Sequence, residues 1–277
     1  MEILDRPPGL GKLYRAAVLR RGSGDTLPGT TLALDGVTVD PGHLADYSRV
    51  CGFRLTGALP GTYPHVLAFP LAMALMTRPD FPFPLLGLVH LANRIEVRRP
   101  LSVEDRLQLR VRAEHLRPHS RGRQVDVVAE ALAGDEVVWS GRSTYLRKEK
   151  GGAGGDGPAG TAHGGVRWKV DPGVGVAYAR VSGDRNPIHT SRLAARLFGF
   201  RRPIAHGMWT KARCLAALEG RLPAGYAVEV NFRSPVRLPS TVEFSAHREQ
   251  ESWHVSVHDP RSGRGHLTGE VGPIPAP

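Results

Sequence analysis

The sequence predicts an α+β fold built from two copies of one domain, each with a helical segment followed by an antiparallel sheet. Three observations support this: an internal repeat, a glycine-rich break near the middle, and period-two alternation after each helical segment. The hydrophobic fraction of 41% and the charged fraction of 23% are typical of a globular protein. A chain of 277 residues is long enough for two ordinary domains.

The internal repeat is clearest near the start of each half. Residues 39–53 recur 131 positions later as residues 170–184, and 8 of the 15 positions are identical, including Val-Asp-Pro-Gly and Tyr-x-Arg-Val. Residues 98–101 match residues 233–236 at an offset of 135. A repeat of this length indicates a duplicated domain, because solenoids repeat at shorter periods.

The break between the halves is the run Gly-Gly-Ala-Gly-Gly-Asp-Gly-Pro-Ala-Gly at residues 151–160. Ordering so many glycines costs much backbone entropy, so such a run behaves as a flexible linker. We therefore assign residues 1–147 to an N-terminal domain, 148–166 to the linker and 167–277 to a C-terminal domain.

Each half is expected to contain the same elements in the same order. An Asp-Pro step opens a short helix, because Asp caps the first turn and proline fits the first helical position. A longer helix follows, at residues 70–76 in the first half and at about 207–218 in the second. Alternation then predicts half-buried antiparallel strands at residues 107–112, 125–130, 228–232 and 253–257.

Composition limits the compartment and the partners. Two cysteines, Cys51 and Cys214, exclude a disulfide framework and a four-cysteine zinc site. The start lacks a basic and then apolar leader, and the apolar stretches 66–76 and 85–92 are too short to span a bilayer. We expect a cytoplasmic protein without a membrane partner.

The net charge of +11 either attracts an anionic partner or has no functional role. Nucleic acid is one candidate, because phosphate contacts require Lys and Arg. The arginines are scattered, however, and aromatic residues make up only 6%, so no stacking platform is evident. We expect no specific nucleic-acid partner and favour an anionic small molecule or an acidic carrier protein.

The segment with the most chemical potential is residues 178–189, Tyr-Ala-Arg-Val-Ser-Gly-Asp-Arg-Asn-Pro-Ile-His. Asp184 and His189 flank an Asn-Pro step that cannot continue a helix, because proline disfavours the helical conformation of Asn186. The chain therefore turns, and a carboxylate and an imidazole can converge on one water and move its proton. The alternative is a loop in which Asp and Asn only satisfy turn backbone.

A second motif lies at residues 198–210 and leads into an apolar helix. Gly207 at its start exposes a backbone N–H at the positive end of the helix dipole, where it can donate to a carbonyl oxygen that gains negative charge. Close helix–sheet packing is the other explanation for this glycine, and both can hold together. His206 is expected to be hydrogen-bonded locally.

Together these motifs resemble the signature of the MaoC-like, R-specific enoyl-thioester hydratases, also called hydratase 2. The resemblance includes residues 178–189, Ala195 and Ala-His-Gly-Met at 205–208, and it is strongest over about 167–277. Through the internal repeat it extends, with fewer matches, to about 30–147. It implies a double hot-dog fold, in which each antiparallel sheet wraps around a long helix.

The resemblance also implies roles for individual residues. Asp184 and His189 would be the catalytic pair, the Gly207 amide the oxyanion donor, and Asn186 the support of the loop. Four further motif residues would shape the turn or border the substrate: Ser182, Gly183, His206 and Met208.

The implied reaction is reversible R-specific hydration of trans-2-enoyl thioesters, or dehydration of (R)-3-hydroxyacyl thioesters, in fatty-acid or polyketide-type metabolism. The substrate would be carried by CoA or by acyl carrier protein, and neither a cofactor nor a metal is implied. One half would stand in for a dimer partner, giving a pseudo-dimer within the chain, and a homodimer of whole chains remains open.

The first half departs from this pattern. In the aligned register Phe53 replaces Asp184, residues 69–70 replace residues 206–207, and six residues that would include Asn-Pro-x-His are missing. We expect this half to be non-catalytic. Its apolar residues suit the lining of an acyl tunnel.

Rival functions fit less well. A metal hydrolase could use Asp184, His189 and His206, but no His-Glu-x-x-His or similar helical spacing is present. A serine hydrolase lacks the Gly-x-Ser-x-Gly elbow. A non-catalytic module that binds acyl thioesters stays an alternative, because a fold does not guarantee activity.

Overall fold

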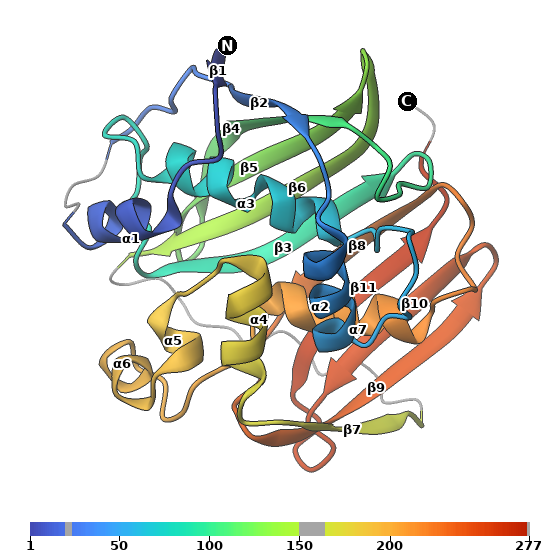
Figure 1. Ribbon diagram of the computed structural model, residues 1–277. Helices are drawn as coiled ribbons and strands as arrows, with labels where there is room; N and C mark the ends of the chain where they lie inside the picture. Colours follow the sequence, from blue (N-terminus) through green and yellow to red (C-terminus); the bar gives the residue numbers. More distant parts are fainter. Residues whose placement is uncertain (20–23, 150–163, 276–277) are drawn as a thin grey trace.

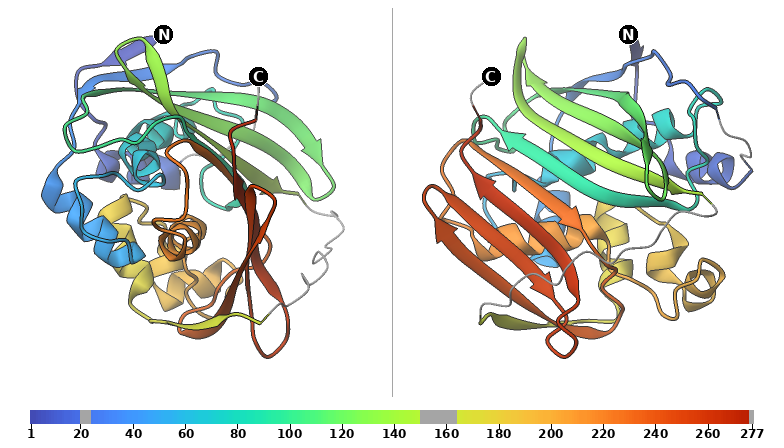
Figure 2. Two further views of the ribbon diagram at one scale, coloured as in Figure 1. Left: turned by 90° about the vertical axis from the view of Figure 1, so that its right-hand side faces the viewer. Right: turned by 180° about the vertical axis from the view of Figure 1, so that it is seen from behind.

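The computed structural model describes residues 1–19, 24–149 and 164–275. These residues form one curved eleven-stranded sheet in the order β1-β2-β4-β5-β6-β3-β8-β11-β10-β9-β7. The helices lie on its inner face, and the sheet curls around the two central helices α3 and α7 (Figures 1 and 2). This arrangement confirms the predicted α+β class with two similar halves.

The N-terminal half supplies the strands on one side of the sheet and three helices. Its strands are β1 (Glu2–Leu4), β2 (Leu32–Val37), β3 (Leu88–Val97), β4 (Leu107–His119), β5 (Gly122–Ala133) and β6 (Glu136–Lys148). Its helices are α1 (Leu10–Leu19), α2 (Pro41–Cys51) and α3 (Tyr63–Met76).

The C-terminal half supplies the remaining strands and four helices. Its strands are β7 (Val166–Val170), β8 (Tyr226–Phe232), β9 (Ser240–Glu249), β10 (Ser252–His258) and β11 (Gly265–Gly272). Its helices are α4 (Val174–Ser182), α5 (Pro187–Thr190), α6 (Arg192–Leu197) and α7 (Gly207–Ala217). The four predicted strand segments fall within β4, β5, β8 and β10, which confirms them. The predicted linker lies mostly at residues 150–163, outside the described residues, and the domain boundaries stay a prediction.

The two halves join through one antiparallel strand pair. β3 of the first half pairs with β8 of the second, with Ala92 opposite Asn231 and Val97 opposite Tyr226. Behind this seam, the ammonium group of Lys211 on α7 is buried. It donates to the side-chain oxygen of Asn93 (2.6 Å), to the Asn93 carbonyl (3.1 Å) and to the Val228 carbonyl (3.1 Å). One side chain thereby ties α7 to both strands of the junction.

The Asp-Pro steps behave differently in the two halves. In α2, Asp40 is the N-cap and accepts hydrogen bonds from the amides of Gly42 (2.7 Å) and His43 (3.3 Å), as predicted. In the second half Asp171 also accepts from an amide two residues on, but α4 begins only at Val174, after its N-cap Gly173. The prediction that the helix opens at the Asp-Pro step is therefore wrong for α4.

The prediction that the first long helix begins at Pro70 is also wrong. α3 begins at Tyr63, and Pro70 lies inside it. Proline in a helix interior removes one backbone hydrogen bond, which made it a plausible boundary. However, this helix is apolar on every side and packs inside the curled sheet, with Leu71 and Leu75 fully buried, and that packing outweighs the lost bond.

Both cysteines are buried and unpaired, in keeping with the absence of a disulfide framework. Among the helices that the structure describes, none has the length and apolar character needed to cross a bilayer.

Candidate active site

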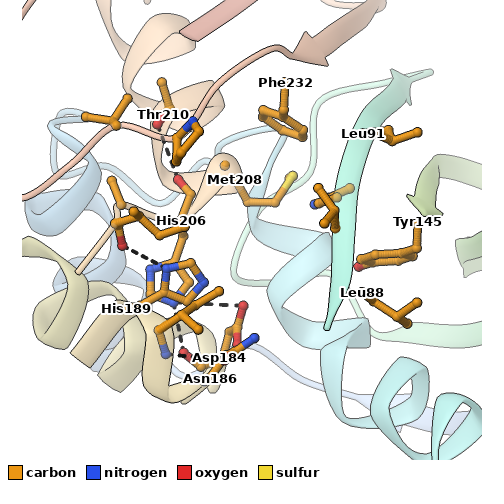
Figure 3. A pocket seen from close by; sticks show the side chains of 18 of the residues that line it. Leu88, Leu91, Tyr145, Asp184, Asn186, His189, His206, Met208, Thr210 and Phe232 are labelled. Carbon is orange, nitrogen blue, oxygen red and sulfur yellow. Dashed lines mark hydrogen bonds and ion pairs between the residues drawn. The ribbon is translucent and has the colours of Figure 1, made fainter. Parts of the chain in front are cut away.

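The loop after α4 is shaped by its sequence. Gly183 ends the helix in the left-handed conformation (φ 75°) and returns its N–H to the Ala179 carbonyl. Asn186 then caps the short helix α5, accepting from the Ile188 amide at 3.3 Å, with Pro187 at the first helical position. The predicted turn at Asn-Pro thus restarts a helix, and this helix carries His189 back toward Asp184 (Figure 3).

Asp184 is held by one of its carboxylate oxygens. Oδ1 accepts from the Asn186 amide (3.1 Å) and from the Tyr14 hydroxyl (3.4 Å). Oδ2 lies 3.8 Å from Nε2 of His206, and 31% of the Asp184 side chain is exposed, toward the cavity it lines. One oxygen is therefore fixed by the protein while the other can contact a bound water or substrate.

His189 is buried, and one of its ring nitrogens is committed. Nδ1 lies 2.8 Å from the carbonyl of Ile204 and must carry the proton, because a carbonyl only accepts. In the neutral imidazole Nε2 is then a proton acceptor. The ring stacks on that of His206, with centroids 3.6 Å apart and planes 25° apart.

His206 supports the loop that carries Asp184. It is the N-cap residue of α7, and its Nε2 donates to the backbone carbonyl of Asp184 at 2.9 Å. Its Nδ1 is buried without a hydrogen-bond partner among the described residues. Met208, two residues after His206, lines the same cavity as the two histidines.

The pKa shifts give the protonation states. Burial has the largest influence on the pKa of Asp184 and raises it, and the neighbouring His206 and His189 lower it. With the Asn186 amide and the Tyr14 hydroxyl added, the net pKa lies below the usual range of a carboxyl. Burial lowers the pKa of His189 below 6.5, although Asp184 opposes this shift. At neutral pH the pair is a carboxylate and a neutral imidazole.

Asp184, His189 and His206 offer ligand-type atoms that all lie within 4.8 Å of one another. The histidines of such a group can hold a metal ion only through ring nitrogens that carry no proton. Nδ1 of His189 and Nε2 of His206 both carry protons toward backbone carbonyls. The lone pairs that remain are Nε2 of His189 and the buried Nδ1 of His206. The absence of a metal or cofactor stays a prediction.

Gly207 opens α7 against the ring of Phe232. A Cβ atom at this position would lie 2.9 Å from Cε1 of Phe232, closer than real Cβ contacts, so the packing explanation for the glycine holds. The N–H groups of a first helical turn have no intrahelical partner. Gly207 lines the cavity, and so do Phe232 and Met208 (Figure 3).

A cavity of about 470 Å³ connects these residues, and both halves line it. The catalytic candidates, together with Asn186 and Ser182, come from the second half. The first half contributes a mostly apolar wall, with Val66, Phe69, Met73, Met76, Leu85 and Leu88. This wall supports the expected role of the first half in lining an acyl tunnel, although His65, His90 and Tyr145 add polar groups to it.

Tyr14 belongs to this site and was missed in the sequence. It lies on α1, outside both repeats, and its hydroxyl contacts the Gly183 carbonyl (3.1 Å) and Asp184 Oδ1 (3.4 Å) and accepts from the Arg185 amide (2.7 Å). Leu10 of the same helix packs against Gly183. No local pattern could reveal this contact, because 170 residues separate Tyr14 from Asp184.

The first half contains a structural counterpart of this site that is built from different residues. Tyr47 and Tyr178 are related by the repeat, and each contacts the N-cap of its central helix. The Tyr47 hydroxyl donates to Thr62 at 2.7 Å, and the ring of Tyr178 lies 4.9 Å from that of His206. Thr62 therefore occupies the place of His206.

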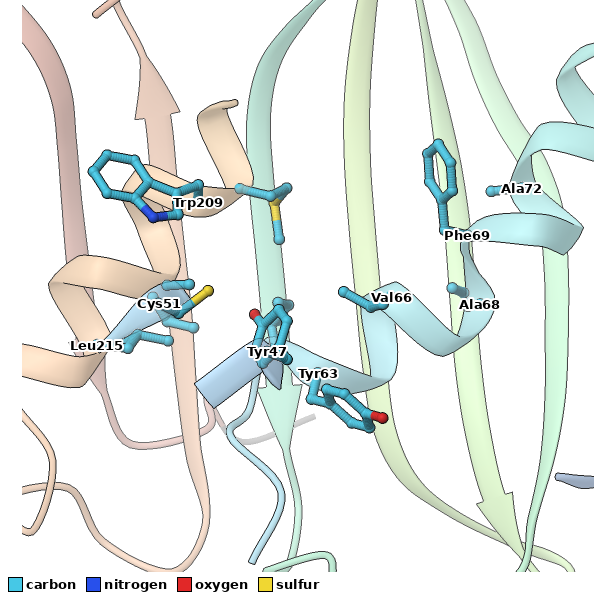
Figure 4. Packing of buried hydrophobic residues seen from close by; sticks show 14 of the residues in the cluster. Tyr47, Cys51, Tyr63, Val66, Ala68, Phe69, Ala72, Trp209 and Leu215 are labelled. Atoms are coloured by element: carbon cyan, nitrogen blue, oxygen red, sulfur yellow. The ribbon is translucent and has the colours of Figure 1, made fainter. Parts of the chain in front are cut away.

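The predicted equivalence of Phe69 with His206 is wrong for this reason. Nine positions separate Phe53 from Thr62, against 22 between Asp184 and His206, so the gap is thirteen residues and not six. Phe53 lines a separate cavity of about 280 Å³. Between the central helices the space is filled by buried side chains, among them Tyr47, Tyr63, Cys51, Trp209 and Leu215 (Figure 4).

Comparison with known proteins agrees with this geometry. The sequence pattern of the protein family described as MaoC like domain matches residues 161–265 of this chain. The chain is 38% identical to the 3-hydroxyacyl-thioester dehydratase X of Mycobacterium tuberculosis. The match covers 97% of this chain and 99% of that protein. The chain belongs to the MaoC-like dehydratase family.

Structures of other MaoC-like proteins show the same architecture. The crystal structure of HtdX from Mycobacterium tuberculosis matches with a TM-score of 0.80 at 37% identity, covering 88% of this chain and 100% of that one. A MaoC-like dehydratase from Phytophthora capsici shares the fold at 18% identity, with a TM-score of 0.71 over 90% of this chain and 96% of that one. The two halves of this MaoC-like chain therefore form a double hot-dog.

A shorter relative is similar to part of the chain only. The 3-hydroxybutyryl-CoA dehydratase of Methylorubrum extorquens is 44% identical over 72 residues, which are 24% of this chain and 46% of that protein.

Proposed function

We propose that this MaoC-like chain catalyses the reversible R-specific hydration of trans-2-enoyl thioesters, and the reverse dehydration of (R)-3-hydroxyacyl thioesters, at Asp184 and His189. A hydro-lyase activity on acyl thioesters follows from its family. One observation supports the assignment of residues: a carboxylate oxygen and an unprotonated imidazole nitrogen converge on one cavity beside the start of α7. CoA and acyl carrier protein are both suitable carriers of the thioester.

The protonation states define the proton transfers. The Asp184 carboxylate and Nε2 of His189 are both unprotonated at neutral pH, so neither holds a proton for C2 at the outset. A water between Asp184 and Nε2 of His189 gives its hydroxyl to C3 and one proton to the pair, and the pair returns that proton to C2. Water is thus the source of both added groups, and no further acid is needed. The two sites titrate jointly, so the proton belongs to the pair.

The Gly207 amide supplies the electrostatic part of the proposal. As C3 is attacked, negative charge moves to the thioester carbonyl oxygen, and an N–H at a helix start stabilises that charge. His206 and Asn186 act through the loop: His206 holds the Asp184 backbone and Asn186 holds the turn. Ser182 also shapes it, since its hydroxyl donates to the Tyr178 carbonyl (2.8 Å) and accepts from the Asp184 amide (3.2 Å).

The test is steady-state kinetics on trans-2-enoyl-CoA substrates of C4 to C16 with Asp184→Asn and His189→Ala. We expect each variant to lose at least about two orders of magnitude in kcat, as is typical when a positioned acid or base is removed. Asp46→Asn is the matched control, because Asp46 is exposed on α2 and pairs only with Arg49 among the described residues.

The alternative function predicts a different result. A non-catalytic module would be stabilised against unfolding by crotonyl-CoA while the absorbance of the enoyl thioester stayed constant. Wild-type turnover by a folded Asp184→Asn or His189→Ala variant would contradict the assignment of the pair.

A further inference from the structure

Three polar side chains interrupt the apolar wall that the first half gives to the main cavity. They are His65 on α3, His90 on β3 and Tyr145 on β6. The proposed hydration uses none of them. Tyr145 lies across the cavity from Asp184, on the same side as Leu88 (Figure 3). The wall that faces an acyl chain therefore contains groups that can form hydrogen bonds.

A bulge in β3 brings two of these residues together. His90 is opposite Tyr145 in the pairing of β3 with β6, and the register shifts between His90 and Ala92. Neighbours in a regular strand face opposite sides, but a bulge re-aims side chains, and residues 88–91 all line the cavity. The rings of His90 and Tyr145 stack with their centroids 4.7 Å apart. The two polar groups thus form one patch of the wall.

Phe232 connects this patch to the proposed oxyanion position. Its ring packs on Gly207, and its centroid lies 4.9 Å from that of the His90 ring. The charge of Asp184 also acts on the pKa of all three polar residues. An acyl chain with its carbonyl at Gly207 and with C2 and C3 at the proposed pair therefore meets the patch with the carbons that follow.

Both histidines of the patch lack hydrogen bonds that a buried imidazole usually makes. Nε2 of His90 is buried without a hydrogen-bond partner among the described residues. No hydrogen bond joins the ring of His65 to any residue that the structure describes. A polar group held in an apolar wall without a partner costs free energy that leucine would not. A few polar groups in a mostly apolar lining are typical of a site that orients a polar ligand atom.

All three groups are uncharged at neutral pH. Burial, with a contribution from the charge of Lys211, lowers the pKa of His65 to about 4. Burial, His65 and Lys211 lower the pKa of His90 to about 3, and burial raises the pKa of Tyr145. A neutral imidazole has one N–H and one lone pair. A keto oxygen can only accept and a carboxylate finds no cation in this patch, whereas a hydroxyl group both donates and accepts.

We propose that His65, His90 and Tyr145 form a subsite for a hydroxyl group on the acyl chain beyond C3. The inference rests on the proposed function and names its substrate class, which is a 2-enoyl thioester with an alcohol further along the chain. Extension of a 3-hydroxyacyl chain by two carbons places the retained hydroxyl at C5. The reaction that supplies this substrate is therefore an elongation in which an earlier hydroxyl was not removed.

The test compares trans-2-octenoyl-CoA with its 5-hydroxy and 8-hydroxy derivatives. Wild-type kcat/KM should be about tenfold higher for a hydroxylated substrate, as expected for one or two added neutral hydrogen bonds. His65→Leu, His90→Leu and Tyr145→Phe should each reduce this preference by about threefold or more. His254→Leu and Tyr63→Phe are the matched controls, because neither residue lines the cavity, and both should keep the preference.

The ratio between substrates separates recognition from a structural role, because damage to the cavity lowers kcat/KM for all three substrates alike. Such an equal loss would overturn the proposal. So would equal wild-type values for the three substrates, a preference for octenoyl-CoA, or a preference that survives in all three variants. A higher value for the 8-hydroxy than for the 5-hydroxy substrate supports a subsite deeper along the wall.

A separate measurement covers failure of the proposed function. Should no thioester turn over, that function fails, and calorimetric titration with octanoyl-CoA and its 5-hydroxy and 8-hydroxy derivatives decides the subsite. Tighter binding of a hydroxylated ligand that is lost in His65→Leu supports it, and equal binding of all three ligands refutes it.

Discussion

At the scale of single residues, the site shows what local sequence can and cannot reveal. Asp184 and His189 stand five positions apart, and the Asn-Pro step between them was enough to predict that the chain turns there. The contact of Tyr14 with Asp184 depends on how α1 packs against the loop, and no spacing in the sequence encodes it. The turn that brings Asp184 and His189 together was therefore predictable, whereas the contact from a residue distant in the sequence was not.

Removing the Tyr14 hydroxyl tests that support. Tyr14→Phe keeps the ring but leaves Asp184 Oδ1 with the Asn186 amide alone among its described donors, so the carboxylate is less firmly oriented. Loss of a hydrogen bond to a charged group costs about 1.5–3 kcal/mol, so kcat should fall by about tenfold or more, with KM little changed. Tyr63→Phe is the matched control, since its hydroxyl bonds His43 away from the cavity. Equal activity of Tyr14→Phe and wild type would show that the contact has no role in positioning.

The pH dependence follows from the direction of the pKa shifts. The proposed mechanism requires neutral His189 and ionised Asp184, and both pKa values lie below their usual ranges. As the pH falls from 7, the rate should decline with a midpoint below 6.5, because the imidazole then binds a proton. The profile of kcat/KM is measured with crotonyl-pantetheine, which has no phosphate to titrate. A midpoint at or above 6.5 would contradict the shift of His189.

At the scale of elements, the two halves differ in how well the start of the central helix could be predicted. α7 begins at Gly207, as the sequence predicted, whereas α3 begins seven residues before the predicted Pro70. A proline is a reliable signal only where packing is weak, and α3 is enclosed by the sheet. Helix boundaries in such a buried segment follow tertiary contacts that a sequence pattern does not contain.

Gly207→Ala tests the start of α7. The new methyl group would meet the Phe232 ring at 2.9 Å and must displace the ring or the helix start. Because the Gly207 amide would move with the backbone, we expect kcat to fall by about 100-fold or more, within the range for a lost oxyanion donor. Gly11→Ala is the control: it has open space on exposed α1, and alanine should raise stability by about 0.5–1 kcal/mol. Normal kinetics of Gly207→Ala would argue against the oxyanion role.

At the scale of the whole molecule, the seam between β3 and β8 makes one cavity out of two halves. The repeat predicted two similar units, but it did not say which strands would meet. The pairing of Ala92 with Asn231 and the contacts of Lys211 show how they do. A buried lysine at such a place could not be recognised from sequence, because Lys211 occupies an ordinary helical position.

Lys211→Met tests the seam. The substitution keeps most of the side-chain volume but leaves two oxygens of Asn93 and the Val228 carbonyl without their donor. Leaving a buried acceptor without its donor costs about 1–3 kcal/mol, so the thermal midpoint should drop by several degrees. Lys169→Met on the exposed face of β7 is the control and should unfold like wild type. An unchanged midpoint for Lys211→Met would show that the lysine does not stabilise the junction.

The thirteen missing residues before Thr62 have a consequence for counting active centres. A symmetric pair of single hot-dogs repeats every group twice, whereas here Phe53 and Thr62 occupy the mirrored places and contribute no acid–base couple. With the proposed pair, we therefore predict one reactive pocket per polypeptide among the residues that the structure describes. Titration with a tight-binding inhibitor should reach its endpoint at one equivalent per chain. The first half can also change in sequence without altering a second copy of the active site.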